Sequence, residues 1–233
     1  MNRLLEKAVR AYGGKQAWSE ARSIHVEFSA AGLAFRLIRR PPFIRARLTM
    51  DICRPLSRIT PIGSDPDITG VLDGSEVRLE TPGGQIIQER KNARAYFPGG
   101  RRLIYWDDLD MAYFANYAMW NYLALPALLL REDIIWTEIQ PGLLEAVFPE
   151  YIPTHNRFQQ FHFDLETGLL RQHDYTAEVI GGLAKAAHVI LEHSEIDGFR
   201  FPSRRRVTPR SGSGHPWRGP TLIEISIHDY LLR

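Results

Sequence analysis

Hydrophobic and polar side chains alternate with a period of two residues along much of the chain. Residues 43–50 (FIRARLTM) are an example, in which one face carries only apolar side chains: Ile44, Ala46, Leu48 and Met50. Residues 76–81 (EVRLET) and 222–227 (LIEISI) repeat the alternation. A period of two is typical of strands that bury one face and expose the other, so these segments are predicted to be half-buried strands.

Turn signals separate the alternating segments. Gly or Pro stands beside a polar residue in LDGSE (72–76), TPGGQ (81–85) and LETG (165–168), which is the chemistry of hairpin turns. The close spacing predicts about ten to twelve strands in one antiparallel meander rather than alternating strand–helix units. No linker or low-complexity tract divides the chain, so we expect a single α+β domain over residues 1–233.

One long helix interrupts this pattern, over residues 107–125. Residues 111–130 (MAYFANYAMWNYLALPALLL) carry no charge, and acidic residues precede them, as suits the positive end of a helix dipole. A run of this length is able to span a bilayer. However, Asn116 and Asn121 disfavour insertion, and a lone span would divide the strands of the sheet between the two sides of the membrane. We therefore predict a helix inside a globular domain.

This helix has no polar face. At about 100° per residue, Tyr113, Tyr117 and Trp120 form one stripe, and a second stripe lies opposite: Met111, Phe114, Ala118, Tyr122 and Leu125. A helix of this kind must be covered nearly all round, so we expect the sheet to curve around it. A second helix is predicted at the N-terminus, within MNRLLEKAVRAYGG.

Two interpretations of the long helix remain open: a filled core, or the wall of a cavity for a hydrophobic ligand. In the second, Tyr113, Tyr117 and Trp120 are expected to face the ligand, because each ring offers apolar area and one hydrogen-bonding group. Asn116 and Asn121 would supply the few polar contacts that such cavities contain. The opposite stripe would then pack against the sheet.

His173 and Tyr175 add candidate chemistry. They share a strand face with Leu169 and Ala177 and are predicted to point inward, where they would contact a ligand headgroup. Alternatively, a neutral histidine, either His173 or His193, would serve as a general base. A buried histidine with only a packing role is the competing interpretation.

The remaining motifs mainly argue against a metal site or a cofactor. Phe161 and Phe163 are expected to take the inner strand face, which leaves His162 and Asp164 in solvent, so we predict no metal site. No G-x-S-x-G elbow, P-loop or dinucleotide fingerprint occurs, and no cofactor is expected. The basic run PSRRRV at 202–207 is predicted to be an exposed strand edge, with contact to anionic lipid as the alternative.

Composition and charge narrow the partners and the compartment. The chain is 44% hydrophobic and 24% charged, with a formal net charge of +2, which is ordinary for a globular protein and does not favour nucleic-acid binding. Cys53 is the only cysteine, so no internal disulfide is possible and a reducing compartment is expected. The first residues contain no apolar run of signal-peptide length, and we expect a cytoplasmic location.

Three segments together resemble the LolA/LolB-like superfamily of lipoprotein and lipid carriers. They are AWSEARSIHVEFSAAG (17–32) after a helix that ends in Gly-Gly, FHFDLETGLLRQHDY (161–175) and SEIDGFRFPSRRRV (194–207). The resemblance implies a long antiparallel sheet curled into a half-barrel, with helices capping its open, apolar side, and a hydrophobic ligand. This chain departs from the carriers because it shows neither a signal peptide nor a lipidated cysteine. No individual binding residue of the family is carried over.

The expected function is non-enzymatic binding or transport of a hydrophobic, lipid-like molecule, held between the curved sheet and the long helix. The expected partners are that small molecule or lipid and, transiently, a membrane. Two alternatives remain: an enzyme that acts on a small apolar substrate through a cavity-facing histidine and Tyr175, and a scaffold whose core is filled.

Overall fold

The computed structural model describes residues 3–97, 104–212 and 214–233, and its strands form one open antiparallel sheet. Within these residues there are thirteen strands, slightly more than the sequence predicts. The first six are β1 Ser23–Ala31, β2 Phe43–Asp51, β3 Leu56–Thr60, β4 Thr69–Asp73, β5 Glu76–Glu80 and β6 Ile86–Arg90. The others are β7 Ile135–Gln140, β8 Leu143–Val147, β9 Phe158–Phe163, β10 Leu170–Thr176, β11 Lys185–Ile196, β12 Phe199–Pro209 and β13 Ile223–Leu232.

The helices are short, apart from one. They are α1 Arg3–Ala11, α2 Lys15–Glu20, α3 Leu33–Leu37, the 3₁₀ helix η1 Ala93–Tyr96, α4 Asp108–Leu123 and α5 Leu125–Leu128. The predicted helix over 107–125 is therefore present as α4, and Pro126 lies in the first turn of α5. Among the described residues, no helix combines the length and the apolar character needed to cross a membrane. The α+β class and the curved antiparallel sheet predicted from the sequence are confirmed.

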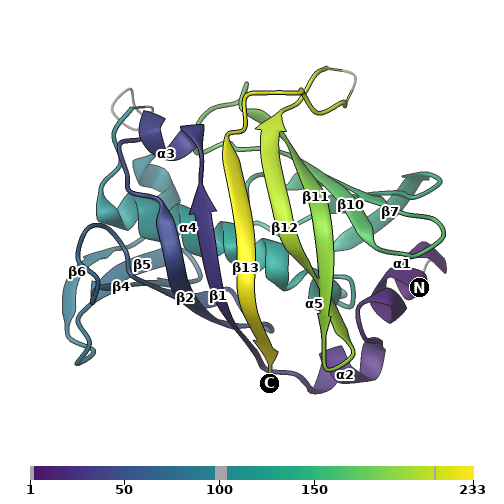
Figure 1. Cartoon of the computed structure of the whole chain (residues 1–233), viewed down its shortest axis with the longest axis horizontal. Helices are drawn as coiled ribbons and strands as arrows, with labels where there is room; N and C mark the ends of the chain where they lie inside the picture. The colour runs from purple at the N-terminus through teal and green to yellow at the C-terminus, as the bar shows by residue number, and fades with distance from the viewer. Residues whose placement is uncertain (1–2, 98–103, 213) are drawn as a thin grey trace.

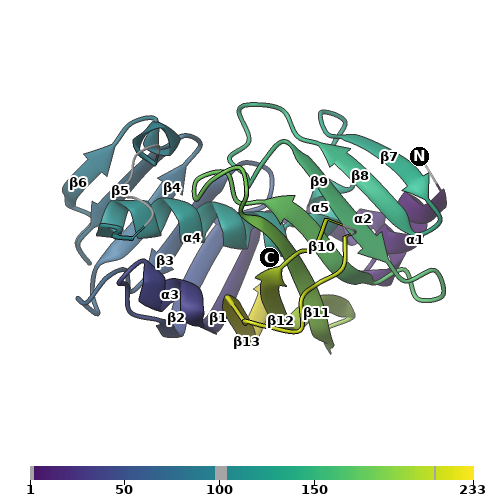
Figure 2. The same cartoon turned by 90° about the horizontal axis from the view of Figure 1, so that it is seen from above.

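The strand order explains why α4 crosses the molecule. The chain begins in the middle of the sheet with β1 and moves outward, one hairpin at a time, to the edge strand β6. It then passes through α4 to β7 at the opposite edge and returns inward to β13, which pairs with β1. Figures 1 and 2 show α4 lying along the concave face between the two edges. The connection between the edges is thus also the element that fills the half-barrel.

The two ends of α4 are fixed in different ways. At its start, Asp107 and Asp110 form a capping box, in which each side chain accepts a hydrogen bond from the other residue's backbone N–H. Arg90 at the end of β6 donates to both carboxylates, at 2.7 Å to Asp110 and 2.8 Å to Asp107. At the other end, the N–H of Ala124 still bonds to the Trp120 carbonyl before the chain turns into α5.

The fold buries α4 almost completely. Fourteen of its sixteen residues are buried, and the two that are not are Asp108 and Phe114. The helix packs closest to β3, β4 and β5, where Gly70 of β4 permits contact: a Cβ there would lie 2.7 Å from the Ala112 methyl group. The absence of a polar face in the sequence therefore reflects a helix that is surrounded by protein.

The predicted register of β2 needs one correction. Ile44 is 75% exposed, and Phe43 takes the buried position instead. Arg45 has a positive φ of 48°, and the four β2 residues from Phe43 to Ala46 lie opposite the three β1 residues from Phe28 to Ala30. This bulge reverses the alternation at its start, after which Ala46, Leu48 and Met50 are buried as predicted.

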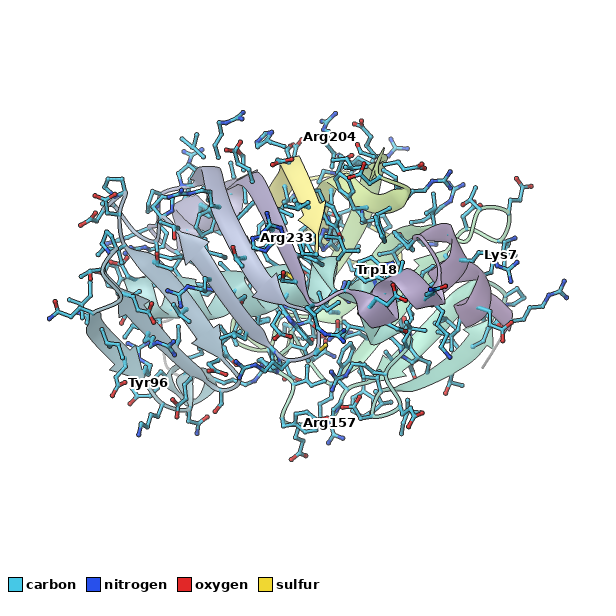
Figure 3. The ribbon with its side chains drawn as sticks, turned by 90° about the horizontal axis from the view of Figure 1, so that it is seen from below. Lys7, Trp18, Tyr96, Arg157, Arg204 and Arg233 are labelled. Atoms are coloured by element: carbon cyan, nitrogen blue, oxygen red, sulfur yellow. The ribbon has the colours of Figure 1, made fainter. Side chains whose placement is uncertain are left out.

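The remaining apolar surface of the second half of the sheet is closed by α1, α2 and α5. Trp18 of α2 is buried, donates through Nε1 to the Tyr12 carbonyl at 2.8 Å and meets the edge of the Phe199 ring. Figure 3 shows Trp18 under the sheet beside α1, which carries Lys7 at the rim. The predicted N-terminal helix thus packs on the sheet through its buried side chains, Leu4, Leu5, Ala8 and Val9.

Candidate functional site

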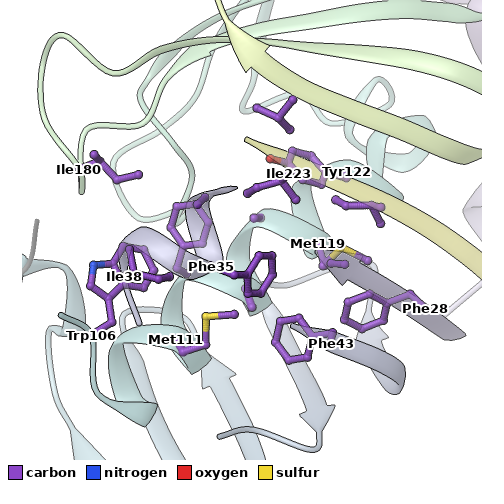
Figure 4. A pocket seen from close by; sticks show the side chains of 17 residues that line it. Phe28, Phe35, Ile38, Phe43, Trp106, Met111, Met119, Tyr122, Ile180 and Ile223 are labelled. Atoms are coloured by element: carbon purple, nitrogen blue, oxygen red, sulfur yellow. The ribbon is translucent and has the colours of Figure 1, made fainter. Parts of the chain in front are cut away.

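An apolar pocket lies between α4, α3 and the central strands β1, β12 and β13. Figure 4 shows Phe28, Phe35 and Phe43 close to Met111 and Met119 of α4. The space open to the centre of a water molecule is about 70 Å³. A single water needs roughly 10–15 Å³ by that measure, so the pocket is several times larger than the space for one water.

The stripe of α4 that lines the pocket is not the one that the sequence singled out. The lining residues of the helix are Met111, Phe114, Ala115, Ala118, Met119 and Tyr122. Phe114 and Met111 were expected to pack on the sheet. Two methionines and two alanines make a surface that adapts to differently shaped ligands, because methionine is flexible and alanine leaves space.

Tyr113, Tyr117 and Trp120 are instead buried among protein groups. Trp120 Nε1 donates to the Asp51 carbonyl at 2.6 Å, and the Tyr117 hydroxyl lies 3.2 Å from His155 Nδ1. Tyr113 packs against the Phe97 ring. The polar groups of Trp120 and Tyr117 therefore find partners inside the fold and the Tyr113 ring packs within it, which removes the reason for placing these rings against a ligand.

Asn116 and Asn121 also have structural partners. Asn116 Nδ2 donates to the carbonyls of Gly70, at 3.1 Å, and Ala112. Asn121 Nδ2 donates to the carbonyls of Tyr117, at 2.8 Å, and Pro153, at 2.9 Å. The two amides tie the helix to β4 and to the segment before β9, and neither belongs to the residues that line the pocket.

His173 and Tyr175 do point inward, where they join a buried cluster of rings. We call this the tyrosine–histidine cluster, and its members are Tyr122, His155, His173, Tyr175 and His188. The Tyr122 hydroxyl lies 2.7 Å from His155 Nε2 and 2.8 Å from the Tyr175 hydroxyl. The His155 and Tyr175 rings stack at 3.8 Å. Only Tyr122 belongs both to this cluster and to the pocket lining.

Two members of the cluster, His155 and His188, were missed by the sequence reasoning. His188 becomes evident only from the pairing of β11 with β10, in which it lies directly opposite His173. His155 lies in the loop before β9, where no periodic pattern exists.

Burial keeps the histidines of this cluster neutral. Loss of solvent lowers the pKa of His155 to about 3 and holds the pKa values of His173 and His188 well below 6.5. The pKa of His193, which lies 3.1 Å from the Tyr12 hydroxyl, falls to about 4 for the same reason. Such weakly basic rings, set back from the pocket, are poorly suited to the general-base role considered for His173 and His193.

Arg205 is a further residue that the sequence reasoning did not single out. The run at 202–207 was expected to be an exposed strand edge, and Arg204 does extend into solvent (Figure 3). Arg205, however, is only 2% exposed, because alternate residues of β12 face the concave side. Its guanidinium lies 5.4 Å from the centre of the Tyr122 ring. The sequence alone does not show which of the three consecutive arginines, 204 to 206, is buried.

The opposite face of β9 and β10 carries a separate polar group. Phe161 and Phe163 take the inner face as predicted. His162 then points outward, with Nε2 2.9 Å from Asp174, and Arg210 donates to the same carboxylate at 3.2 Å. Among the described residues, no set of three His, Cys, Asp or Glu side chains is placed to hold a metal ion.

Comparison with known proteins supports the fold. No family model and no curated protein matches the sequence. The crystal structure of a LolA superfamily protein from Nitrosomonas europaea matches 99% of this chain and 92% of its own, with 12% identity and a TM-score of 0.52. A putative outer membrane lipoprotein-sorting protein domain from Vibrio parahaemolyticus matches 98% of this chain and 92% of its own, with 9% identity and a TM-score of 0.50. The LolA-like fold implied by the sequence resemblance is thus confirmed.

Proposed function

We propose that this protein is a non-enzymatic binding or carrier protein for a hydrophobic, lipid-like molecule that occupies the apolar pocket. The observation that carries the proposal is the pocket itself, whose lining atoms are nearly all apolar and which lies between α4 and the concave face of a LolA-like sheet. Apolar pockets with few polar groups are typical of sites for small hydrophobic ligands.

The pocket wall suggests where a ligand enters. Most lining residues are buried, but Ile180 is 37% exposed and Phe114 is half-buried. Ile180 belongs to the loop at 177–184, which also contains Gly181 and Gly182. We propose that this loop and α3 separate to admit the ligand, because neither contributes a strand to the sheet.

Exposed apolar side chains surround this proposed entrance. Leu183 in the same loop is 95% exposed, and Leu37 at the end of α3 is 56% exposed. Exposed leucines of this kind favour brief contact with a membrane, from which a lipid-like ligand would be taken up or to which it would be returned. Release then requires only that the acceptor bind the ligand more tightly.

Native mass spectrometry of the purified protein, before and after extraction with organic solvent, tests the proposal. We expect a co-purifying lipid-like mass that extraction removes. Ala118→Leu adds bulk to the pocket wall and should abolish the bound mass. Ala95→Leu, the same change at an exposed site, should retain it. If the wild type carries no ligand and binds no added lipid, the protein is a scaffold with a closed core.

A further inference from the structure

Arg205 is a buried cation without a carboxylate partner among the described residues. Its Nε has no hydrogen-bond partner there, and its Nη2 donates only to the Pro202 carbonyl, at 3.3 Å. Burial lowers the pKa of Arg205 only to about 10, so the group is charged at neutral pH. A buried charge that is not paired is strongly unfavourable, and proteins normally supply an opposite charge or a metal.

The groups around Arg205 are neutral. The side chains whose electrostatic interactions with it matter most are tyrosines: Tyr12, Tyr122, Tyr175 and Tyr230. His188 is next to them, 1% exposed, and neither of its ring nitrogens has a hydrogen-bond partner among the described residues. The His188 ring meets the Tyr122 ring edge-on at 4.3 Å. An anion placed here would therefore find one full positive charge and unsatisfied N–H groups.

The strand register places Arg205 directly beside the apolar pocket. Val207, two residues further along β12 on the same face, lines the pocket. Ile225, opposite Arg205 on β13, lines it as well. Tyr122 also lines the pocket, and the centre of its ring lies 5.4 Å from the Arg205 guanidinium. The guanidinium and the pocket therefore share Tyr122 as a neighbour.

We propose that the pocket and Arg205 form one site for a hydrophobic monocarboxylate, whose chain fills the pocket while its carboxylate accepts hydrogen bonds from Arg205. This rests on the proposed function and names the chemical class of its ligand. Guanidinium and carboxylate match in bidentate geometry. One carboxylate neutralises the one guanidinium, whereas a phosphate monoester carries about −1.5 to −2 and would leave a buried negative excess.

Binding of octanoate, octan-1-ol and octyl phosphate to the wild type and to Arg205→Met tests this assignment, by isothermal titration calorimetry. Eight carbons suit the size of the pocket and stay soluble as monomers. We expect the wild type to bind octanoate about 10- to 100-fold more tightly than octan-1-ol, the range for a hydrogen-bonded charge. In Arg205→Met the ratio of the two affinities should fall to about one, because the charge that distinguishes the two ligands is gone. Arg205→Lys should keep a reduced preference, because it retains the charge without the planar fork.

Each negative outcome of this binding experiment contradicts a different part of the proposal. Equal affinity of the wild type for octanoate and octan-1-ol, or an equal loss of both in Arg205→Met, overturns the role of Arg205 and leaves the proposed function intact. Tighter, Arg205-dependent binding of octyl phosphate overturns the carboxylate in favour of a phosphorylated lipid. If none of the three compounds binds and no lipid co-purifies, the proposed function itself is overturned.

A measurement on the wild type alone keeps the test valid if Arg205→Met does not fold. The carbon-13 resonance of carboxyl-labelled octanoate reports its ionisation by NMR. An ion pair with Arg205 should keep the bound carboxylate ionised at a pH where free octanoate is already half protonated. A bound ligand that titrates like the free acid, or at a higher pH, overturns the ion pair.

Discussion

Phe114 and Trp120 lie on the same helix, less than two turns apart, but their side chains have different surroundings. Phe114 is half-buried and lines the pocket, whereas Trp120 is fully buried and bonds to the Asp51 carbonyl. The sequence predicted that this helix is covered on all sides. It could not predict which stripe meets the pocket, because that depends on the positions of distant partners such as His155.

Replacement of each ring by alanine should therefore affect a different property: stability for Trp120 and ligand affinity for Phe114. Trp120→Ala removes a large core side chain and its hydrogen bond to the Asp51 carbonyl, and should cost roughly 3–5 kcal/mol in the free energy of unfolding. Phe114→Ala should cost clearly less and change the affinity for an apolar fluorescent probe. Denaturant melts and probe titrations of both variants measure this. Unfolding of Phe114→Ala together with a stable Trp120→Ala would reverse the assignment of the two stripes.

The buried histidines should make the protein acid-sensitive. Burial lowers the pKa of His155 to about 3 and lowers those of His173 and His188, so the unfolded chain binds protons that the folded chain excludes. The folded protein therefore has its full stability from these histidines above the pKa of histidine in the unfolded chain, about 6.5. This contribution is lost as the pH falls toward the folded values, by up to about 1.4 kcal/mol per pH unit for each histidine.

Urea melts at pH 7.5 and 5.0 measure this loss. His188→Leu should lose less stability between the two pH values than the wild type, because one of the histidines with a lowered pKa is gone. His215→Gln, at an exposed position, should behave like the wild type. An unchanged pH dependence in His188→Leu would show that its ring is solvated or already protonated in the folded protein.

At the scale of elements, the start of α4 depends on an edge strand. The sequence indicated this start by its acidic residues, but not that Arg90 of β6 would bridge two of them. Asp110 is fully buried, and the ion pair with Arg90 helps to compensate its charge. Edge strands are usually the least constrained part of a sheet, and here the edge is held by the helix that it helps to position.

Removal of this clamp should be costly. Arg90→Met breaks the ion pair with the buried Asp110 carboxylate and should lower the free energy of unfolding by about 3–5 kcal/mol. Arg200→Met breaks an exposed pair with Glu195 and should change it by less than about 1 kcal/mol. Denaturant melts compare the two. Asp110→Asn in the Arg90→Met background should recover part of the loss, and a failure to do so would mean that Arg90 acts by packing alone.

At the scale of the whole molecule, the sequence predicted the class of fold better than its connections. Alternation and turns identified an antiparallel meander, and three segments pointed to a half-barrel. No local signal indicated that β1 and β13 are neighbours, because their pairing joins residues such as Ile24 and Leu232. The bulge in β2 was not predicted either. It shifts the register of β2 against β1 by one residue, and this becomes visible only when the partner strand is known.

The pairing of β1 with β13 has a consequence for the synthesis of the protein. Ser23 leaves the ribosome about 200 residues before Ile223, which at about 5–20 residues per second is roughly 10–40 s. During that time β1 can pair with β2 on one side only, and its other edge is an open row of backbone donors and acceptors beside an apolar surface. The nascent chain therefore passes through a long interval in which the middle of its future sheet is an unprotected edge.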